Sequence, residues 1–193
     1  MGLENVACNN ILNGIRKSYD NAVELISEAE ILRDNRKWSR AYTLCQLAIE
    51  ELGKVPLLFQ LLFDRIISPK IDYKEINKIF YDHKLKTEES IRGVIASLQV
   101  YKDKFGSEWV DNLIEKLEIS ISEVEELDNR KNKSIYVSIK ENDFQSPNEL
   151  IGEKEFDEIY GKTIFPKMAF RSLIVGLEEN LNEVVRLISE RES

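Results

Sequence analysis

His83 is the only histidine in the 193-residue chain, and it lies in the stretch FYDHKLKT. On a helix of about 100° per residue, His83, Thr87 and Ser90 share the face that carries the apolar Ile79 and Ile91. Buried polar groups that stay unpaired cost roughly 1–3 kcal/mol each. These side chains therefore need partners, or a cleft that admits water or a ligand.

Three polar residues on one flank of the apolar stripe of segment 38–67 are candidate partners: Arg40, Glu51 and Lys54. On the helical wheel Glu51 lies closest to the core side, whereas Glu50 points away. We expect the flank to meet His83 and Lys86 across a groove between two helices. An imidazole, a carboxylate that orients it and cations that hold an anion can move a proton while stabilising charge on a phosphate, without a metal.

Simpler interpretations of the same residues stand beside this one. A single histidine on an apolar face is often a hydrogen-bonded core residue. Glu50 and Lys54, four residues apart, are typical of a surface ion pair worth a few tenths of a kcal/mol. The stretch RKNKSIYV is equally typical of a basic loop. No glycine-rich phosphate loop or metal-ligand spacing occurs, so no metal and no cofactor are expected.

The elements that must position these residues are long helices, because the chain has only 8 Gly and 4 Pro. Apolar periodicity predicts five helices, with a kink at Pro56 in the second: residues 18–34, 38–67, 73–105, 107–128 and 166–190. In the last helix Pro166 is the expected start and six residues are expected to face inward: Met168, Leu173, Leu177, Leu181, Val184 and Ile188. Between the last two of these helices, the stretch 134–139 is β-prone. Ser146–Pro147 is typical of a helix start. The sequence predicts an all-α bundle forming one domain over residues 1–193, with a short irregular or extended insertion near residues 130–150.

The charge and hydropathy of the chain limit its function. A net charge of −8 argues against a protein that coats nucleic acid, although it leaves room for a small basic patch. Neither a signal peptide nor an apolar run of transmembrane length is recognisable. We therefore expect a cytoplasmic protein that does not enter a membrane.

Three stretches, AEILRDNRKWSRAYTLCQLAIEELGK, FYDHKLKT and RKNKSIYVSI, resemble the AbiV-type abortive-infection proteins, which belong to the HEPN superfamily of helical bundles. The resemblance covers roughly residues 29–139. It implies a homodimer with a cleft at or near the dimer interface. It also implies a metal-independent ribonuclease, in which a polar set with a histidine activates the ribose 2′-hydroxyl and an Arg or Lys steadies the phosphate.

Nine positions match the family pattern: Arg40, Glu50, Glu51, Lys54, Asp82, His83, Lys86, Arg130 and Tyr136. We expect four of these to be catalytic, with His83 as acid and base, Glu51 orienting it, and Lys54 and Lys86 binding phosphate. Three are expected to bind RNA: Arg40, Arg130 and Tyr136. One departure concerns the HEPN ribonuclease signature, an Arg followed after four to six residues by a His late in the fold. No histidine follows His83, and Ile76, Asn77 and Lys78 stand where the Arg is expected.

The resemblance predicts a phage-defence toxin that a phage-encoded protein activates and that then shuts down translation, with RNA as its substrate. The alternative is a non-catalytic dimeric module that binds a phage or host protein. In that case dimerisation uses the apolar segment 57–67, and recognition uses the acidic helix 108–128 and the irregular segment 134–150.

Overall fold

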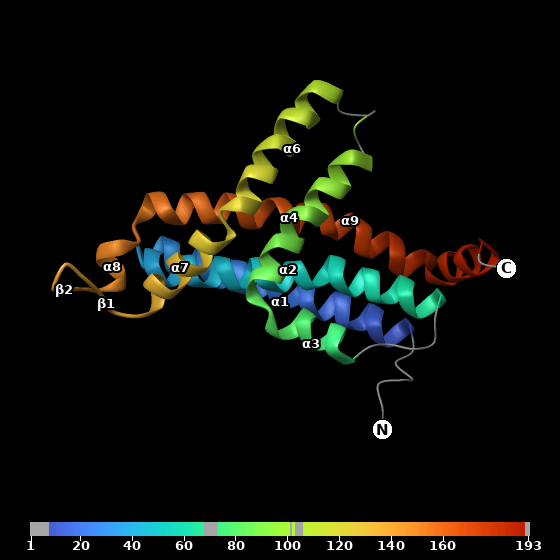
Figure 1. Cartoon of the computed structure of the whole chain (residues 1–193), viewed down its shortest axis with the longest axis horizontal. Helices are drawn as coiled ribbons and strands as arrows, with labels where there is room; N and C mark the ends of the chain where they lie inside the picture. The colour runs from blue at the N-terminus through green and yellow to red at the C-terminus, as the bar shows by residue number, and fades with distance from the viewer. Residues whose placement is uncertain (1–7, 68–72, 101, 103–105, 192–193) are drawn as a thin grey trace.

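The computed structural model describes residues 8–67, 73–100, 102 and 106–191. Within these ranges the chain is a bundle of helices with one small hairpin, as Figure 1 shows. The elements are α1 (Cys8–Asp34), α2 (Trp38–Ile67), α3 (Tyr73–Tyr81), α4 (His83–Val100), α6 (Ser107–Ser122), α7 (Val124–Ile135), β1 (Ser138–Lys140), β2 (Asp143–Gln145), α8 (Pro147–Leu150) and α9 (Glu153–Arg191). The prediction of an all-α bundle with a short extended insertion is confirmed.

Helix α2 is the centre of the bundle. It packs against α1, α4, α7 and α9, so most of its circumference is covered. The main core forms where these helices meet, and its fully buried side chains include Ile15, Ile26, Leu52, Leu62 and Phe170. A second cluster at the other end of α2 joins Tyr42 to Phe156 and Ile159 of α9. Because α2 has few exposed positions, its buried polar residues Gln46 and Glu50 find their partners on neighbouring helices.

The predicted helix 73–105 is wrong, because it breaks at Asp82 into α3 and α4. The Asp82 carboxylate accepts a hydrogen bond from the Leu85 backbone N–H at 3.0 Å, which makes Asp82 the N-cap of α4. The axis of α4 leaves α3 at a steep angle and rises away from the bundle (Figure 1). Residues 101 and 103–105 of the predicted helix lie outside the described part of the chain. The break places His83 at a helix N-terminus rather than inside a continuous helix.

The predicted helix 107–128 also divides, at Glu123, into α6 and the differently directed α7 (Figure 1). The first helix begins ten residues before its predicted start, at Cys8, because Ile11 and Ile15 continue the buried stripe of α1.

The start of the last helix was predicted wrongly, because α9 begins at Glu153 and runs through Pro166. A Glu155 carboxylate oxygen accepts the Gly152 N–H at 2.9 Å and so closes the first turn. Leu177 and Leu181 are buried as expected and Val184 is partly buried. Met168 and Leu173 were expected to face inward but are 69% and 45% exposed. The side chain of Ile188 lies outside the described ones.

The insertion contains an antiparallel hairpin of β1 and β2, in which Ile139 pairs with Phe144. Its two-residue turn, Glu141–Asn142, has φ angles of 53° and 72°, as a type I′ turn requires. The predicted extended piece at 134–139 is thus confirmed only from Ser138. The predicted helix start at Ser146–Pro147 is confirmed as the N-cap and first residue of α8. None of the described helices is long and apolar enough to cross a bilayer.

Candidate functional site

His83 is the first residue of α4, and its side chain is 55% exposed. Its Nδ1 lies 2.5 Å from Oε2 of Glu50, a carboxylate on α2 that is 4% exposed. In a neutral imidazole, Nδ1–H donates to the carboxylate and Nε2 carries a free lone pair. His83 is therefore not a buried core histidine. It is a surface imidazole oriented by a buried acid.

Two buried lysines compensate the charge of Glu50. Lys131 of α7 places its Nζ 2.8 Å from Glu50 Oε1 and also 2.8 Å from Oδ1 of Asp128. Lys86 of α4 places its Nζ 3.7 Å from Glu50 Oε2 and donates to the Phe80 carbonyl at 3.1 Å. A buried carboxylate needs such partners, since taking an isolated charge out of water costs several kcal/mol. Glu50 thus joins α2, α4 and α7 at one point.

The two lysines respond differently to burial. For Lys86, desolvation outweighs the nearby carboxylates and lowers its pKa below the ordinary value of 10.5. For Lys131, desolvation also opposes the charge, but the hydrogen bonds to Asp128 and Glu50 prevail and its pKa is raised. Lys86 is the less well compensated of the two.

The carboxylate expected to orient His83 was Glu51, and this expectation is corrected by the structure. Glu51 instead pairs with Lys54, whose Nζ lies 2.6 Å from its Oε1. The Lys54 ammonium also lies 5.2 Å from the centre of the Phe80 ring. On a helix covered on most sides, apolar residues no longer mark one core face, so the wheel placed Glu50 outward in error.

The close approach of α4 to α2 depends on Gly53. A Cβ atom at this position would lie 1.7 Å from the Lys86 carbonyl oxygen. Next to this crossing, Gln46 donates to the Thr87 hydroxyl at 3.2 Å, and that hydroxyl donates to the His83 carbonyl at 3.1 Å. The polar face predicted for α4 is therefore buried against α2, and only His83 at its end reaches solvent.

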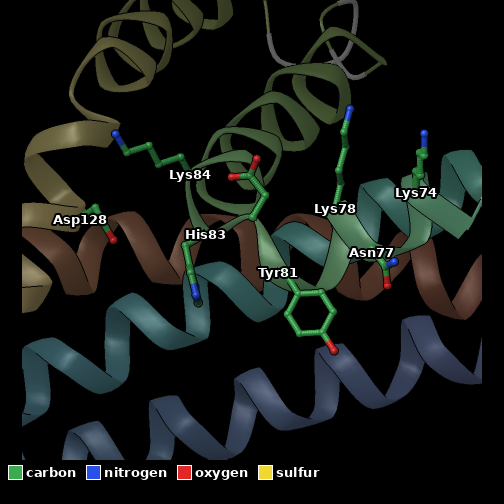
Figure 2. Close-up of a pocket in the computed structure, with 8 residues that line it drawn as sticks. Lys74, Asn77, Lys78, Tyr81, His83, Lys84 and Asp128 are labelled. Carbon is green, nitrogen blue, oxygen red and sulfur yellow. The ribbon is translucent and has the colours of Figure 1, made fainter.

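His83 lies in an open groove of about 660 Å³ that runs along α3 and the start of α4. Figure 2 shows Lys74 and Lys78 rising on one side and His83 reaching down toward α2. The groove is lined by Lys74, Asn77, Lys78, Tyr81, Asp82, His83, Lys84 and Asp128. Its cationic groups come from α3 and the first turn of α4.

The lysines expected to bind phosphate lie deeper than this groove. Lys86 is 3% exposed, and the Lys54 side chain is 13% exposed and paired with Glu51. Lys78 and Lys84 are exposed and line the groove, although Lys84 also reaches Glu125 at 3.3 Å. An anion in the groove would meet these two lysines before it met either buried one.

The three expected RNA-binding residues are absent from the described lining of the groove. Arg40 donates to the Ile135 carbonyl at 3.3 Å, and Tyr136 is 64% exposed beside the hairpin. Arg130 is held by Glu126 at 3.0 Å and Glu158 at 3.2 Å. Of the expected residues, His83 and Lys86 both contact Glu50, Lys54 and Glu51 pair with each other, and the other three make their contacts elsewhere.

Sequence reasoning missed the part that Glu50 and Lys131 play in the site. The signal for Glu50 was its place in the family-like AIEELGK stretch, next to Glu51. Lys131 gave no local signal, because it reaches Glu50 across 81 positions of the chain. Among the described residues, no three His, Cys, Asp or Glu side chains are grouped as a metal site would need.

Comparison with known proteins identifies the family of the chain. Searches of curated proteins and of solved structures found no significant match. A family model, that of the AbiV family of HEPN proteins, matches residues 10–163, which include α2, the whole His83 groove and α7. The chain therefore belongs to the HEPN AbiV family.

Proposed function

We propose that the chain is an abortive-infection effector that cleaves RNA without a metal and uses His83 to transfer protons. One observation carries this proposal: the exposed imidazole is fixed through Nδ1 by a buried carboxylate and borders a groove lined by lysines. The His83 side chain is 55% exposed and lines this groove, so a ligand can reach it. Membership of the HEPN AbiV family supports a role in abortive infection.

The proposed reaction uses the free Nε2 of His83 as a base. Nε2 takes the proton of a ribose 2′-hydroxyl, the 2′ oxygen forms a bond to the adjacent phosphorus, and the bond from phosphorus to the 5′ oxygen breaks. The leaving oxygen takes a proton from water, and the products are a 2′,3′-cyclic phosphate and a 5′-hydroxyl. Glu50 stabilises the imidazolium that forms, as an orienting carboxylate does in other histidine-dependent reactions.

Lys78 and Lys84 are the groups best placed to stabilise the phosphate. Lys78 precedes His83 by five positions, where the HEPN ribonuclease signature has an arginine, and both residues line the groove. A lysine ammonium can neutralise a phosphate as a point charge but cannot make the bidentate contact of arginine. We assign phosphate binding to these two lysines in place of Lys54 and Lys86.

The substitution His83→Ala is expected to abolish RNA cleavage in cells during phage challenge. The variant keeps its fold, because His83 is exposed and Glu50 retains both lysines; we expect a stability loss of about 1 kcal/mol. RNA integrity and the chemistry of new 3′ ends are followed, together with unfolding of the purified proteins. Wild type should produce 2′,3′-cyclic phosphate ends, and the variant should produce none.

The matched control is Lys116→Ala, which removes an exposed charge from α6, away from the groove. It should cleave like wild type. Phage protection by wild type with intact RNA would contradict the proposal and leave the alternative, a non-catalytic module that acts by binding a phage or host protein.

We propose that the chain is a homodimer that buries a second, apolar groove. This groove of about 570 Å³ lies between α2, α4 and α9, with Phe59, Phe63, Phe170 and Leu173 in its wall. Leu173 is 45% exposed and Val100, at the α4 side, is 79% exposed. Contiguous apolar surface of this kind is typical of an interface.

The substitution Leu173→Asp is expected to convert the dimer to a monomer, because it buries an unpaired charge in the interface while leaving the exposed side chain free to hydrate in the monomer. Light scattering coupled to size-exclusion chromatography measures the mass. A wild-type protein that elutes as a monomer at every soluble concentration would contradict the homodimer.

A further inference from the structure

A smaller and more enclosed pocket of about 140 Å³ lies between α2, α7 and α9, separate from the His83 groove. Its floor is formed by Tyr42, Leu127 and Ile159, which are all buried. Its charged lining comes from Glu123, Glu126, Arg130, Glu155, Glu158 and Lys162. Arg130 directly precedes Lys131, so α7 contributes one residue to this pocket and the next to the ion pair with Glu50.

The Tyr42 hydroxyl is an unpartnered polar group on the floor of this pocket. The side chain is 1% exposed, and its oxygen has no hydrogen-bond partner within the described residues. A tyrosine hydroxyl both donates and accepts, and leaving it unpaired in a buried position costs free energy. Burial raises the pKa of this hydroxyl well above its ordinary value, so it stays a neutral O–H. Because Tyr42 lines the pocket, a donor or acceptor bound there is the nearest available partner for this hydroxyl.

The charge of the lining selects the kind of ligand. Four carboxylates face two cations, so the pocket is negative. Hydrogen bonds inside the described chain engage one oxygen of each carboxylate: Glu126 and Glu158 with Arg130, Glu123 with Lys162, and Glu155 with the Gly152 N–H. The second oxygens remain to accept from a ligand. An anion is therefore disfavoured, and a group that brings positive charge and N–H donors is favoured.

Two of these carboxylates are held in their ionised form. The hydrogen bond from Lys162 holds the pKa of Glu123 below its ordinary value. The hydrogen bond from the Gly152 backbone does the same for the pKa of Glu155. The described carboxylates are not grouped as a metal site would require. Their charge thus persists at neutral pH and suits an organic cation.

We propose that this pocket binds the head group of one organic cation, an alkylammonium or a guanidinium, with the Tyr42 oxygen and the rim carboxylates accepting its N–H bonds. The size agrees with a head group rather than a whole polyamine, because a cavity of 140 Å³ equals the liquid volume of about four or five waters. The apolar floor then contacts the methylene next to the charge. The proposal is independent of any RNA cleavage at His83.

The test is a titration of the full chain with methylguanidinium and with ethylammonium, followed by calorimetry and amide NMR. Wild type should bind saturably, with shifts at α7 and α9. Tyr42→Phe and Glu158→Gln should each weaken binding at least tenfold. Glu118→Gln, an exposed change on α6, should bind like wild type. Without ligand, Tyr42→Phe should unfold at the same temperature as wild type or higher, because it removes an unpartnered hydroxyl.

The source of the cation is distinguished by comparing binding affinities. One probe is a free diguanidine or diamine, and the other is a short peptide that carries one arginine. The same peptide with citrulline in place of arginine is the control. Tighter binding of the arginine peptide identifies the side chain of a protein partner, and tighter binding of the free cation identifies a small metabolite. Absence of saturation, equal binding by Tyr42→Phe, or a soaked crystal with only water at the Tyr42 hydroxyl would overturn the proposal.

Discussion

Replacing Gly53 by alanine is expected to destabilise the protein by about 3 kcal/mol or more. The added Cβ would lie 1.7 Å from the Lys86 carbonyl oxygen and 2.9 Å from its Cα. Backbone atoms cannot rotate away as a side chain can, so α4 as a whole must move away from α2. Urea denaturation of purified wild type and variant measures the loss.

Gly161→Ala is the matched control, because the same methyl group at that position of α9 meets nothing within 4 Å. In a helix interior the change from glycine to alanine stabilises by about 0.5–1 kcal/mol. The two variants should therefore move stability in opposite directions. Equal stability of Gly53→Ala and wild type would show that the two helices are not in contact at this residue.

Gly53 also matters for the site, because it lies one turn after Glu50 on α2. The close crossing that it allows brings the first turn of α4 to the Glu50 carboxylate, with His83 Nδ1 at 2.5 Å. A variant that pushed α4 outward would separate the imidazole from its orienting acid even if the bundle survived. Gly53 thus helps to bring His83 next to Glu50 without contacting either side chain's reactive atoms itself.

Apolar periodicity predicted the bundle well where a helix has one buried face. The central part of α1 shows this, since Ala22, Ile26 and Ala29 recur at helical spacing and are buried. Periodicity failed at helix ends, because the break at Asp82 changes the direction of the axis without interrupting the apolar pattern. Aspartate is a common N-cap residue, so Asp82 was the sign of this helix start in the sequence. Its carboxylate caps α4 in the structure. Pro166 was misleading in the opposite way, since buried residues on both sides of it, Phe156 before and Phe170 after, belong to one helix.

The candidate site was predictable as a set of residues but not as a set of contacts. His83 and Lys86 both reach Glu50, whereas Glu51 and Lys54 pair with each other, and the catalytic roles assigned to these residues remain predictions. The choice between Glu50 and Glu51 required knowledge of how α7 packs, because Lys131 approaches α2 from that side. Local spacing along α2 contains no information about a partner that lies 81 residues away.

Glu50→Ala is expected to be strongly destabilising, by about 3–5 kcal/mol, because it leaves buried cations without their counter-charge. Lys131 keeps Asp128 as a partner, whereas Lys86 keeps only the carbonyl of Phe80 within hydrogen-bond distance in the described structure. Glu51→Ala is the matched control. It should cost clearly less than Glu50→Ala, since the Lys54 and Glu51 side chains are 13% and 19% exposed, against 4% for Glu50, and Lys54 keeps its contact with the Phe80 ring. Thermal and urea unfolding at pH 7 compare the two.

The pH dependence of Glu50→Ala identifies Lys86 as the source of the loss. Burial lowers the pKa of Lys86 in the folded wild type, and removal of Glu50 lowers it further, because the nearest anion is gone. Between that lowered pKa and the ordinary 10.5, the unfolded chain binds more protons than the folded one, so stability rises with pH. The deficit of Glu50→Ala relative to wild type should therefore shrink as the pH is raised from 7 toward 10, and Lys86→Met in the Glu50→Ala background should remove this pH dependence. A deficit that is constant with pH would assign the loss to packing rather than to an uncompensated charge on Lys86.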